Sequence, residues 1–297
     1  MSFRPITRDD FGSVVELLIA DEERLYGRPS RIGAGDLEQW LSRSDLPVDS
    51  WLLEDEAGLL AGGWSDAVGD LAVGIGVVHP RAKGRGLGRQ LADRSEARAR
   101  ERGVRRIHQF VLGGDPAATR LFLDRGYREV RRFYEMAIDL DREPPPPSVP
   151  AGLELETLRE DDARSFFEAL DEAFQDHWEH HSQPFEQWWE RHRKTSGFDL
   201  SLWFLIRDGG EIAAAARNEA NRNGGGYVGA LGVRRPWRGR GLGRALLLHA
   251  FREFHARGIA RVTLGVDATS PTGATKLYES VGMTVEQENV VYERTLR

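Results

Sequence analysis

Apolar and polar residues alternate along much of this chain with the two-residue period that is typical of half-buried β-strands. LWFLI (202–206) and EIAAAAR (211–217) are separated by Asp208-Gly209-Gly210, which is a tight-turn signal, so they predict a β-hairpin. YVGALGV (227–233) alternates larger residues with small ones and predicts a strand that leads into a turn rich in glycine and arginine. RVTLGV (261–266) predicts a further strand, and VVYERTL (290–296) a last one.

Helical spacing appears between these strands. The pair Asp161-Asp162 precedes an apolar-periodic segment and marks a helix start. PTGATKLYESVG (271–282) predicts a short helix. The helix predicted after the Gly/Arg turn places several residues near one face, namely Leu242, Ala245, Leu246, His249 and Phe254.

The whole pattern occurs twice. ITRDDFGSVVELL (6–18) is similar to LREDDARSFFEAL (158–170), and AATRLFLDRGY (117–127) is similar to GATKLYESVGM (273–283). Between them, RAKGRGLGRQLADRSEARARERG (81–103) has its counterpart at 234–258. The offset of roughly 152 to 156 positions is far longer than a solenoid period, so the repeated unit is a whole domain.

Two tandem domains of mixed α/β structure are therefore expected, at residues 1–140 and 153–297. DREPPPPSVPAG (141–152) is a stiff polyproline segment that suits a linker between them. The strands predicted for the first copy are WLLED (51–55), LLAGGW (59–64), LAVGIGVV (71–78), RIHQFVL (106–112) and RFYEMAIDL (132–140).

Composition narrows the class of protein. A length of 297 residues is comfortable for two hydrophobic cores. The chain has no cysteine, which excludes disulfides, thiolate metal sites and a covalent cysteine intermediate. No apolar run is long enough for a membrane helix, and the first residues do not resemble a secretory signal, so we expect a cytoplasmic protein without a membrane partner. The net charge of −6 argues against a nucleic-acid partner.

The Gly/Arg turn is the first candidate for chemistry. A helix start has backbone N–H groups without partners and a partial positive charge, so glycines that admit a close approach can let it hold a pyrophosphate. Arg238, Arg240 and Arg244 add side-chain charge at the second turn. No Lys-Ser or Lys-Thr pair completes a P-loop, and bulky Leu246 and Leu91 stand where a dinucleotide-binding turn needs a third small residue. The ligand is therefore neither a P-loop nucleotide nor, on this pattern, a dinucleotide.

RGRGLG (238–243) resembles the acetyl-CoA motif of the GNAT acetyltransferases, and VDATSPTGATKLYESVGM (266–283) resembles a second motif of that family. Matches occur in both halves, so the resemblance covers nearly the whole chain, and its layout is similar to tandem members of the mycothiol synthase type. The resemblance implies two GNAT domains, each with a mixed, mostly antiparallel central sheet, helices on both faces, and a cleft between its splayed fourth and fifth strands. It also implies acetyl-CoA as co-substrate and no metal.

The resemblance also assigns site residues. The turn would hold the CoA pyrophosphate, and the backbone around Leu231, Gly232 and Val233 would pair with pantetheine and polarise the thioester. Gly229 and Gly232, with Gly74 and Gly76 in the first copy, would ease the splay of the strand. The other coenzyme-binding candidates are Arg238, Gly239, Arg240, Gly241, Leu242, Gly243, Arg244 and Ser270, with Val78, Lys83, Gly84, Arg85, Gly86 and Gly88 in the first copy. Ser270 stands where the family commonly has asparagine.

Tyr278 occupies the position at which the family keeps a tyrosine that protonates the leaving thiolate. The first copy has Phe122 there, without a hydroxyl, so the second domain is predicted to be catalytic and the first non-catalytic, with or without bound CoA. Glu219 is the candidate general base, acting through a water; it can equally be an ordinary surface carboxylate.

Residues 174–192 form the most unusual stretch, FQDHWEHHSQPFEQWWERH. By family analogy it lies over the acceptor site. Its aromatic and histidine residues could line a pocket or pack in the core. These residues are Trp178, Trp188, Trp189, His177, His180 and His181. A metal at His177 and His181 is conceivable from their i,i+4 spacing, but no acidic third ligand is signalled.

Two functions remain open at this stage, besides nucleic-acid binding, which ranks last. The first is an N-acetyltransferase that transfers acetyl from acetyl-CoA to a small-molecule amine by direct attack in a ternary complex. The second is a non-catalytic acyl-CoA-binding sensor or interaction protein. Either protein would be a monomer or a homodimer.

Overall fold

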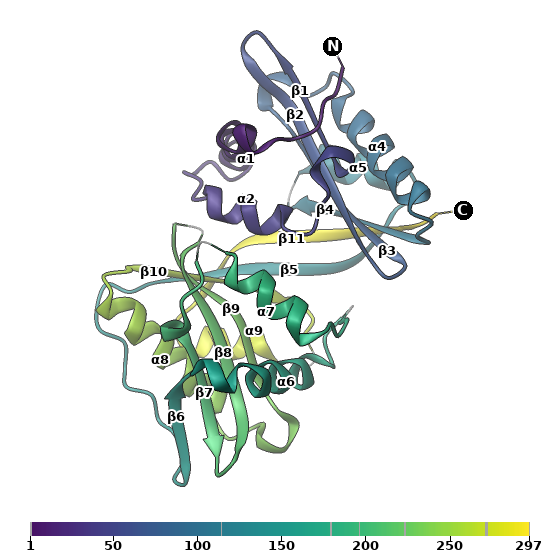
Figure 1. Cartoon of the computed structure of the whole chain (residues 1–297). Coiled ribbons are helices and arrows are strands. Elements are labelled where there is room, and N and C mark those ends of the chain that lie inside the picture. Colours follow the sequence, from purple (N-terminus) through teal and green to yellow (C-terminus); the bar gives the residue numbers. More distant parts are fainter. Residues whose placement is uncertain are drawn as a thin grey trace. The chain divides into compact units, whose positions relative to one another are not determined.

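A computed structural model describes residues 2–113, 115–178, 180–195, 197–222, 224–270 and 273–296. The chain forms two compact units, one of residues 1–133 with 287–297, the other of residues 134–286. Both are mixed α/β structures with mostly antiparallel sheets, as the sequence predicts (Figure 1).

The first unit orders its strands β1-β2-β3-β4-β11. The β1–β2, β2–β3 and β4–β11 pairs are antiparallel, whereas β3 and β4 are parallel. Its strands are β1 (Ser50–Asp55), β2 (Gly58–Val68), β3 (Leu71–Val78) and β4 (Arg106–Leu112), with β5 (Arg128–Asp139) and β11 (Thr284–Thr295) each running from one unit into the other. Its helices are α1 (Phe11–Tyr26), α2 (Ala34–Leu41), α3 (Leu46–Asp49), α4 (Leu87–Glu101) and α5 (Pro116–Asp124), with 3-10 turns at Arg8–Asp10 and Pro80–Ala82.

The second unit repeats this plan in the order β6-β7-β8-β9-β10. Gly209 and Gly210 form the predicted hairpin turn between β7 and β8, and Gly209 has a φ of 59° that favours glycine. The elements are β6 (Leu153–Thr157), α6 (Ala163–Phe174), α7 (Phe185–Arg193), β7 (Trp203–Asp208), β8 (Glu211–Arg222), β9 (Gly225–Val233), α8 (Leu242–Ala256), β10 (Arg261–Asp267) and α9 (Ala274–Ser280), with 3-10 turns at Glu160–Asp162, Leu200–Leu202 and Arg235–Trp237.

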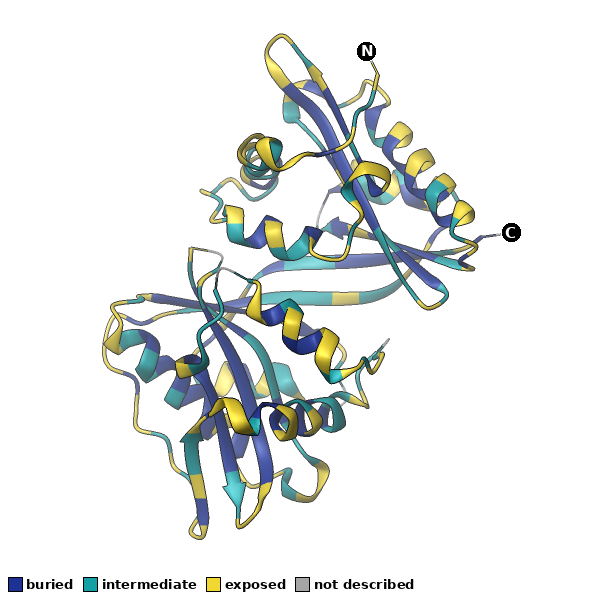
Figure 2. Cartoon of the chain, in the orientation of Figure 1, coloured by how far each residue is buried: buried dark blue, intermediate teal, exposed yellow. Residues whose placement is uncertain are grey.

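Helices cover both faces of the second sheet. A Cβ placed on Gly232 would lie 2.8 Å from Ala173 of α6, whereas the side chain of the next residue, Val233, lies beside Gly243 of α8. Because neighbouring residues of a strand face opposite sides, α6 and α8 lie on opposite faces. The buried core between these layers contains large side chains such as Phe166, Phe204, Phe251 and Phe254 (Figure 2).

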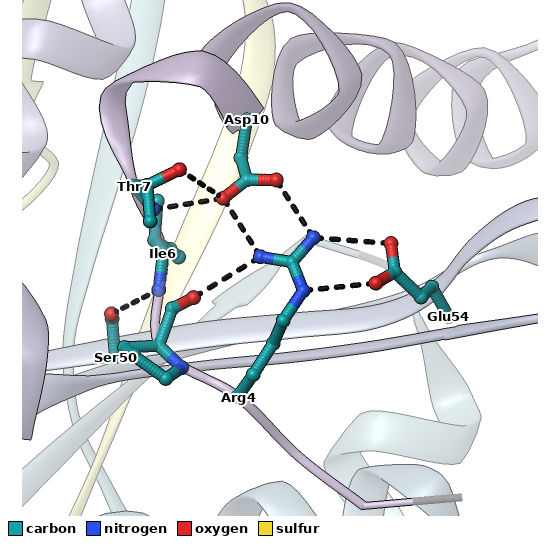
Figure 3. Close-up of polar contacts among 7 residues, drawn as sticks. Arg4, Ile6, Thr7, Asp10, Ser50 and Glu54 are labelled. Carbon is teal, nitrogen blue, oxygen red and sulfur yellow. Dashed lines mark hydrogen bonds and ion pairs between the residues drawn. The ribbon is translucent and has the colours of Figure 1, made fainter.

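The N-terminal segment is tied to the first sheet by Arg4. Its backbone pairs with Leu52 of β1, and its guanidinium donates to Asp10 at 2.8 Å and to Glu54 at 2.9 Å (Figure 3). Asp10 also accepts from the Thr7 amide, which caps the turn that leads into α1. The first helix is thus held to the edge strand by a network of charged groups.

The boundaries of the two units differ from the domain boundaries expected from the sequence, which are 1–140 and 153–297. The last strand of the second copy, β11, pairs with β4, and its Val290 and Tyr292, with Leu296 just after it, are buried in the core of the first unit. The last strand of the first copy, β5, instead contributes Met136 to the core of the second unit. Because the two strands are equivalent in the repeat, the sequence pattern alone does not tell which sheet each one completes. Segment 141–152 contacts α8, where Arg252 donates to the Pro144 carbonyl at 2.8 Å.

Candidate active site

β9 and β10 pair over a very short distance before they separate. Gly226 pairs with Val262 and Tyr227 with Thr263, and no later pair joins the two strands within the described residues, although β9 continues to Val233. The splay that the family resemblance implies is therefore confirmed (Figure 1). One edge of β9 is left without a strand partner along most of its length.

A β-bulge lies in this part of β9. Arg217 of β8 faces Ala230 and Asn218 faces Val228, so Gly229 has no residue opposite it. A bulge bends a strand and re-aims its side chains. Gly229 thus sits where the distortion occurs, as expected, whereas Gly232 lies in the regular part of the ladder.

The backbone beyond the bulge presents polar groups to the open edge. The Arg234 amide donates to the Ala213 carbonyl of β8 at 3.0 Å. Because backbone groups alternate between the two sides of an antiparallel strand, those of Leu231 and Val233 point away from β8, toward the side where β10 has separated. The geometry places a row of backbone donors and acceptors along this edge.

The Gly/Arg turn follows directly. Gly239 and Gly241 have φ of 76° and 82°, a region that L side chains rarely adopt. Gly241 caps α8 without a side-chain bond, so the first amides of the helix, from Leu242, Gly243 and Arg244, have no intrahelical acceptor. A Cβ on Gly243 would lie 3.0 Å from Leu277 of α9, which explains why glycine allows the two helices to approach.

The three arginines of the turn differ in their contacts. Arg238 donates to the Val233 carbonyl at 3.1 Å, to the Ala173 carbonyl at 3.2 Å and to Asp176 at 3.1 Å, so its guanidinium joins β9 to the end of α6. Arg240 lies 3.6 Å from Asp208 and is largely exposed. Arg244 is exposed and makes no hydrogen bond or ion pair with a residue that the structure describes.

Tyr278 lies on α9 and is buried, with 8% of its surface exposed. Burial raises the pKa of its phenol well above the usual value, and nearby Tyr227 adds to this pKa increase. The Tyr227 hydroxyl lies 3.5 Å from the position of a Cβ on Gly265 of β10, so its side chain reaches from β9 across to β10. Ser270 lies in the turn after β10, where its amide donates to the Asp267 carbonyl; Pro271 and Thr272, which follow, lie outside the described residues.

Glu219 is a buried residue of β8, with 6% exposed, so it is not the ordinary surface carboxylate considered from the sequence. Its Oε1 accepts a hydrogen bond from Arg217, and its Oε2 lies 3.6 Å from Arg222. Arg217 is also buried, with 8% exposed. Two guanidinium groups therefore hold this carboxylate inside the unit.

Comparison with known proteins agrees with this geometry. Residues 16–127 and 163–283 each match the acetyltransferase (GNAT) family. The chain belongs to the GNAT acetyltransferase family. It is an N-acetyltransferase by this assignment, and the family uses acetyl-CoA as co-substrate.

Curated relatives match most of this acetyltransferase, and solved structures share its fold over nearly the whole chain. A mycothiol acetyltransferase of Thermobispora bispora is 33% identical over 225 residues, which cover 73% of this chain and 74% of that protein. The crystal structure of a GCN5-related N-acetyltransferase from Sphaerobacter thermophilus is 31% identical, with a TM-score of 0.86 over 99% of this chain and 95% of that one. A tandem GNAT protein from the clavulanic acid biosynthesis pathway, at 18% identity and a TM-score of 0.74, covers 99% of this chain and 98% of its own and shares the fold.

The first unit of the acetyltransferase keeps the turn but not the bulge. Gly84 and Gly86 have φ of 79°, and Gly88 lies beside Leu121 and Val78, as Gly243 lies beside Leu277 and Val233. However, β3 pairs with β2 without a register shift from Leu71 to Val78, so it has no bulge at Gly74 or Gly76. Its recorded pairing with β4 ends at Gly74, so a splay eased by these two glycines stays a prediction. Arg85 of this turn is exposed.

Lys83 and Phe122 are also placed differently from their counterparts. Lys83 pairs with Asp21 at 2.8 Å and with Asp115 at 2.9 Å, and Arg24 donates to the same Asp115. This cluster connects the segments that follow β3 and β4. Phe122 packs in the core against Tyr127, with ring centroids 5.1 Å apart.

The stretch at 174–192 divides into two parts. Trp188 and Trp189 are buried core residues that pack around Trp203, and buried His192 donates from Nδ1 to the Trp188 carbonyl at 2.7 Å. Burial lowers the pKa of His192 to about 3, with a contribution from Arg217.

The other part of the stretch precedes α7. The ring of His177 packs at a tilt against that of Phe174, with centroids 4.3 Å apart, and burial lowers the pKa of His177. His180 pairs with Asp171 at 3.1 Å, while Trp178 and His181 also make contacts. Among the described residues, no group of three or more His, Cys, Asp or Glu side chains is placed to hold a metal ion, and no helix is long and apolar enough to cross a membrane.

Sequence reasoning did not identify three residues of this site. No motif contains Arg217, Tyr227 or Asp176. Each of these residues makes a contact on another segment or across a bulge. One signal was present in the sequence. The apolar run from Ile212 to Ala216 is followed in the same strand by the charged residues Arg217 and Glu219. Charged residues at buried strand positions are usually paired.

Proposed function

We propose that the second unit transfers the acetyl group of acetyl-CoA to an amine of a small molecule by direct attack, and that the first unit is not catalytic. The observation that carries the proposal is the open edge of β9, with its bulge at Gly229. β3 of the first unit has no such bulge. The relatives named mycothiol acetyltransferase favour an acceptor of the kind that those enzymes acetylate.

In this proposal the coenzyme is bound mostly by backbone. The amides of Gly239 to Arg244 hold the pyrophosphate, because a helix start with close-approaching glycines stabilises anions. Leu231 and Val233 pair with the pantetheine arm. Arg238 acts mainly within the protein, since its guanidinium already bonds β9 and α6.

The transfer step is a displacement at the thioester carbonyl. The amine nitrogen forms the new C–N bond, the C–S bond breaks, and backbone donors of β9 stabilise the charge that develops on the carbonyl oxygen. Glu219 accepts the proton that the amine loses, directly or through a water. Tyr278 hydrogen-bonds or protonates the leaving thiolate, and its raised pKa keeps the phenol protonated near neutral pH.

A thiol-release assay tests the proposal. Acetyl-CoA is offered with a panel of amines that includes glucosamine, aminoglycosides and the unacetylated amine precursor of mycothiol. We expect amine-dependent thiol release, reduced about 100-fold in kcat by Tyr278→Phe, since general acids typically contribute 10²–10⁴-fold. Tyr292→Phe in the first unit, the matched control, should keep the wild-type rate. Coenzyme binding without thiol release for any amine would favour the sensor function instead.

A further inference from the structure

We infer that Arg217 is a positioning residue that orients Glu219 for proton transfer, and that the Gly229 bulge makes room for the Arg217 guanidinium. The inference rests on the proposed function of the second unit. It adds a role for two residues that no motif of the chain identifies.

The guanidinium fills the space where a side chain at position 229 would be. A Cβ on Gly229 would lie 2.7 Å from Nη2 of Arg217 and 2.9 Å from its Cζ. Real Cβ contacts are essentially never this short, so any residue larger than glycine would displace the guanidinium. The φ of Gly229 is not in the left-handed region, so the requirement for glycine comes from this contact and not from the backbone conformation.

From this place Arg217 bonds to the candidate base. The two residues are two positions apart on β8 and therefore on the same face of the sheet, and Nη1 of Arg217 donates to Oε1 of Glu219. Glu219 stands opposite Tyr227 of β9, at the rung where β9 and β10 are last paired. The carboxylate is thus fixed beside the point at which the strands separate.

Stability alone does not account for the pair, because a buried ion pair loses about as much through desolvation as it gains from attraction. The first unit supports a role in function. Counted from the equivalent two-residue hairpin turn, Trp64 and Asp66 occupy the places of Arg217 and Glu219, and Trp64 stacks on Trp40 at 6.5 Å. That unit has neither the buried arginine nor the bulge, so the two features occur together.

Among the described residues, the charged and titratable groups near Glu219 include Arg217 and Arg222 on its own strand and Tyr227 on β9, while His192 on α7 senses the charge of Arg217. Loss of the Arg217 guanidinium removes the donor that holds Oε1 of Glu219. The carboxylate is then no longer fixed beside the point at which the strands separate, so kcat/KM for the amine should fall.

The experiment compares Arg217→Met, Arg217→Lys and Gly229→Ala with the wild-type enzyme and with Gly210→Ala. The Gly210 control is a glycine of the same unit with nothing within 4 Å of its Cβ position. Thiol release with the best amine of the panel is measured from pH 5 to pH 9, together with the KM for acetyl-CoA.

We expect kcat/KM for the amine to fall about 10-fold or more in Arg217→Met and Gly229→Ala, and less in Arg217→Lys, which keeps the charge. The KM for acetyl-CoA should stay within about twofold. If Arg217→Met does not fold, Gly229→Ala still tests the inference, because the Gly229→Ala substitution removes no charge.

Two failures can be told apart. A wild-type enzyme without amine-dependent thiol release would contradict the proposed function and remove this inference with it. An active wild type whose Arg217→Lys and Gly229→Ala variants keep its kcat/KM for the amine would overturn the inference alone.

Discussion

Phe122 and Tyr278 occupy the same place in the two copies but differ in more than a hydroxyl. Phe122 packs in a core, edge-to-face with Tyr127 and stacked on Tyr292, in a unit whose strand β3 has no bulge. Tyr278 lies in the unit where β9 and β10 separate after two pairs. The difference between the units thus includes the backbone around each ring.

This difference gives a prediction for the double variant Tyr278→Phe/Phe122→Tyr. Restoring a hydroxyl in the first unit should leave kcat at the level of Tyr278→Phe, because β3 lacks the bulge that accompanies the site. The thiol-release assay measures this. Recovery of more than about a tenth of the wild-type kcat would contradict the assignment of catalysis to the second unit.

The Arg4–Asp10 pair gives a second prediction at the residue scale (Figure 3). The hydrogen bond from Arg4 lowers the pKa of Asp10 well below its usual range. A lowered pKa stabilises the folded state above the unfolded value, and this stabilisation is lost as the pH falls through the folded value. Asp10→Asn should cost about 1 kcal/mol at pH 7, a modest figure because Arg4 is 39% exposed.

Urea unfolding at pH 7 and at pH 3 measures this effect. The deficit of Asp10→Asn relative to the wild type should be smaller at pH 3 than at pH 7. An equal deficit at both values would mean that the loss comes from the cap on the Thr7 amide and not from the charge.

At the element scale the two Gly/Arg turns have nearly the same backbone but different surroundings. Gly86 and Gly241 cap their helices with φ of 79° and 82°. Within the described residues, buried carboxylates contact the basic residue that begins the motif in the first unit only. There, Asp21 and Asp115 contact Lys83. Carboxylates at this place repel a pyrophosphate.

A matched pair of variants, Gly241→Val and Gly86→Val, tests which turn binds the coenzyme. A β-branched residue at a positive φ is strained, so each variant distorts only its own turn. By calorimetry we expect one CoA per wild-type chain, no measurable binding to Gly241→Val, and unchanged binding to Gly86→Val. Two bound molecules per wild-type chain, or loss of binding in Gly86→Val, would contradict this prediction.

Much of the second unit could be predicted at this scale, because motifs and periodicity are local. The hairpin at Gly209-Gly210, the strand at 227–233 and the helix after the Gly/Arg turn are where the sequence predicts them. The bulge at Gly229 could not be located, since it depends on how β8 and β9 pair. The Arg217–Glu219 bond joins residues two positions apart on β8, so their spacing was visible in the sequence, but the burial that makes the bond significant was not.

At the scale of the whole molecule, the last strand of the chain is part of the first unit. Val290 and Tyr292 of β11 are buried there, as is Leu296 just after the strand. Glu293 of β11 bonds Arg128 at 2.9 Å and His108 at 3.1 Å. The repeat gave no means to predict this exchange, because β5 and β11 are equivalent in the two copies. The chain is therefore not two independent halves cut at the proline segment.

Truncated chains test whether the first unit needs β11 in order to fold. A chain that ends at residue 286 loses three buried apolar side chains from the first unit, each worth about 1.5–3 kcal/mol. We expect residues 1–140 alone to give no cooperative unfolding transition, whereas residues 1–133 joined through a flexible Gly/Ser linker to residues 284–297 should fold. Circular dichroism during thermal unfolding distinguishes the two. A cooperative, native-like transition for residues 1–140 would show that β11 is dispensable.

The central claim is that the open edge of β9 is the acetyl-transfer site of this acetyltransferase. The most direct measurement is a crystal structure of the full chain with CoA. The account predicts the pyrophosphate at the amides that follow Gly239, the pantetheine along Leu231 and Val233, and the thiol within hydrogen-bond distance of the Tyr278 hydroxyl. CoA bound only at the first turn, or a thiol directed away from Tyr278, would contradict it.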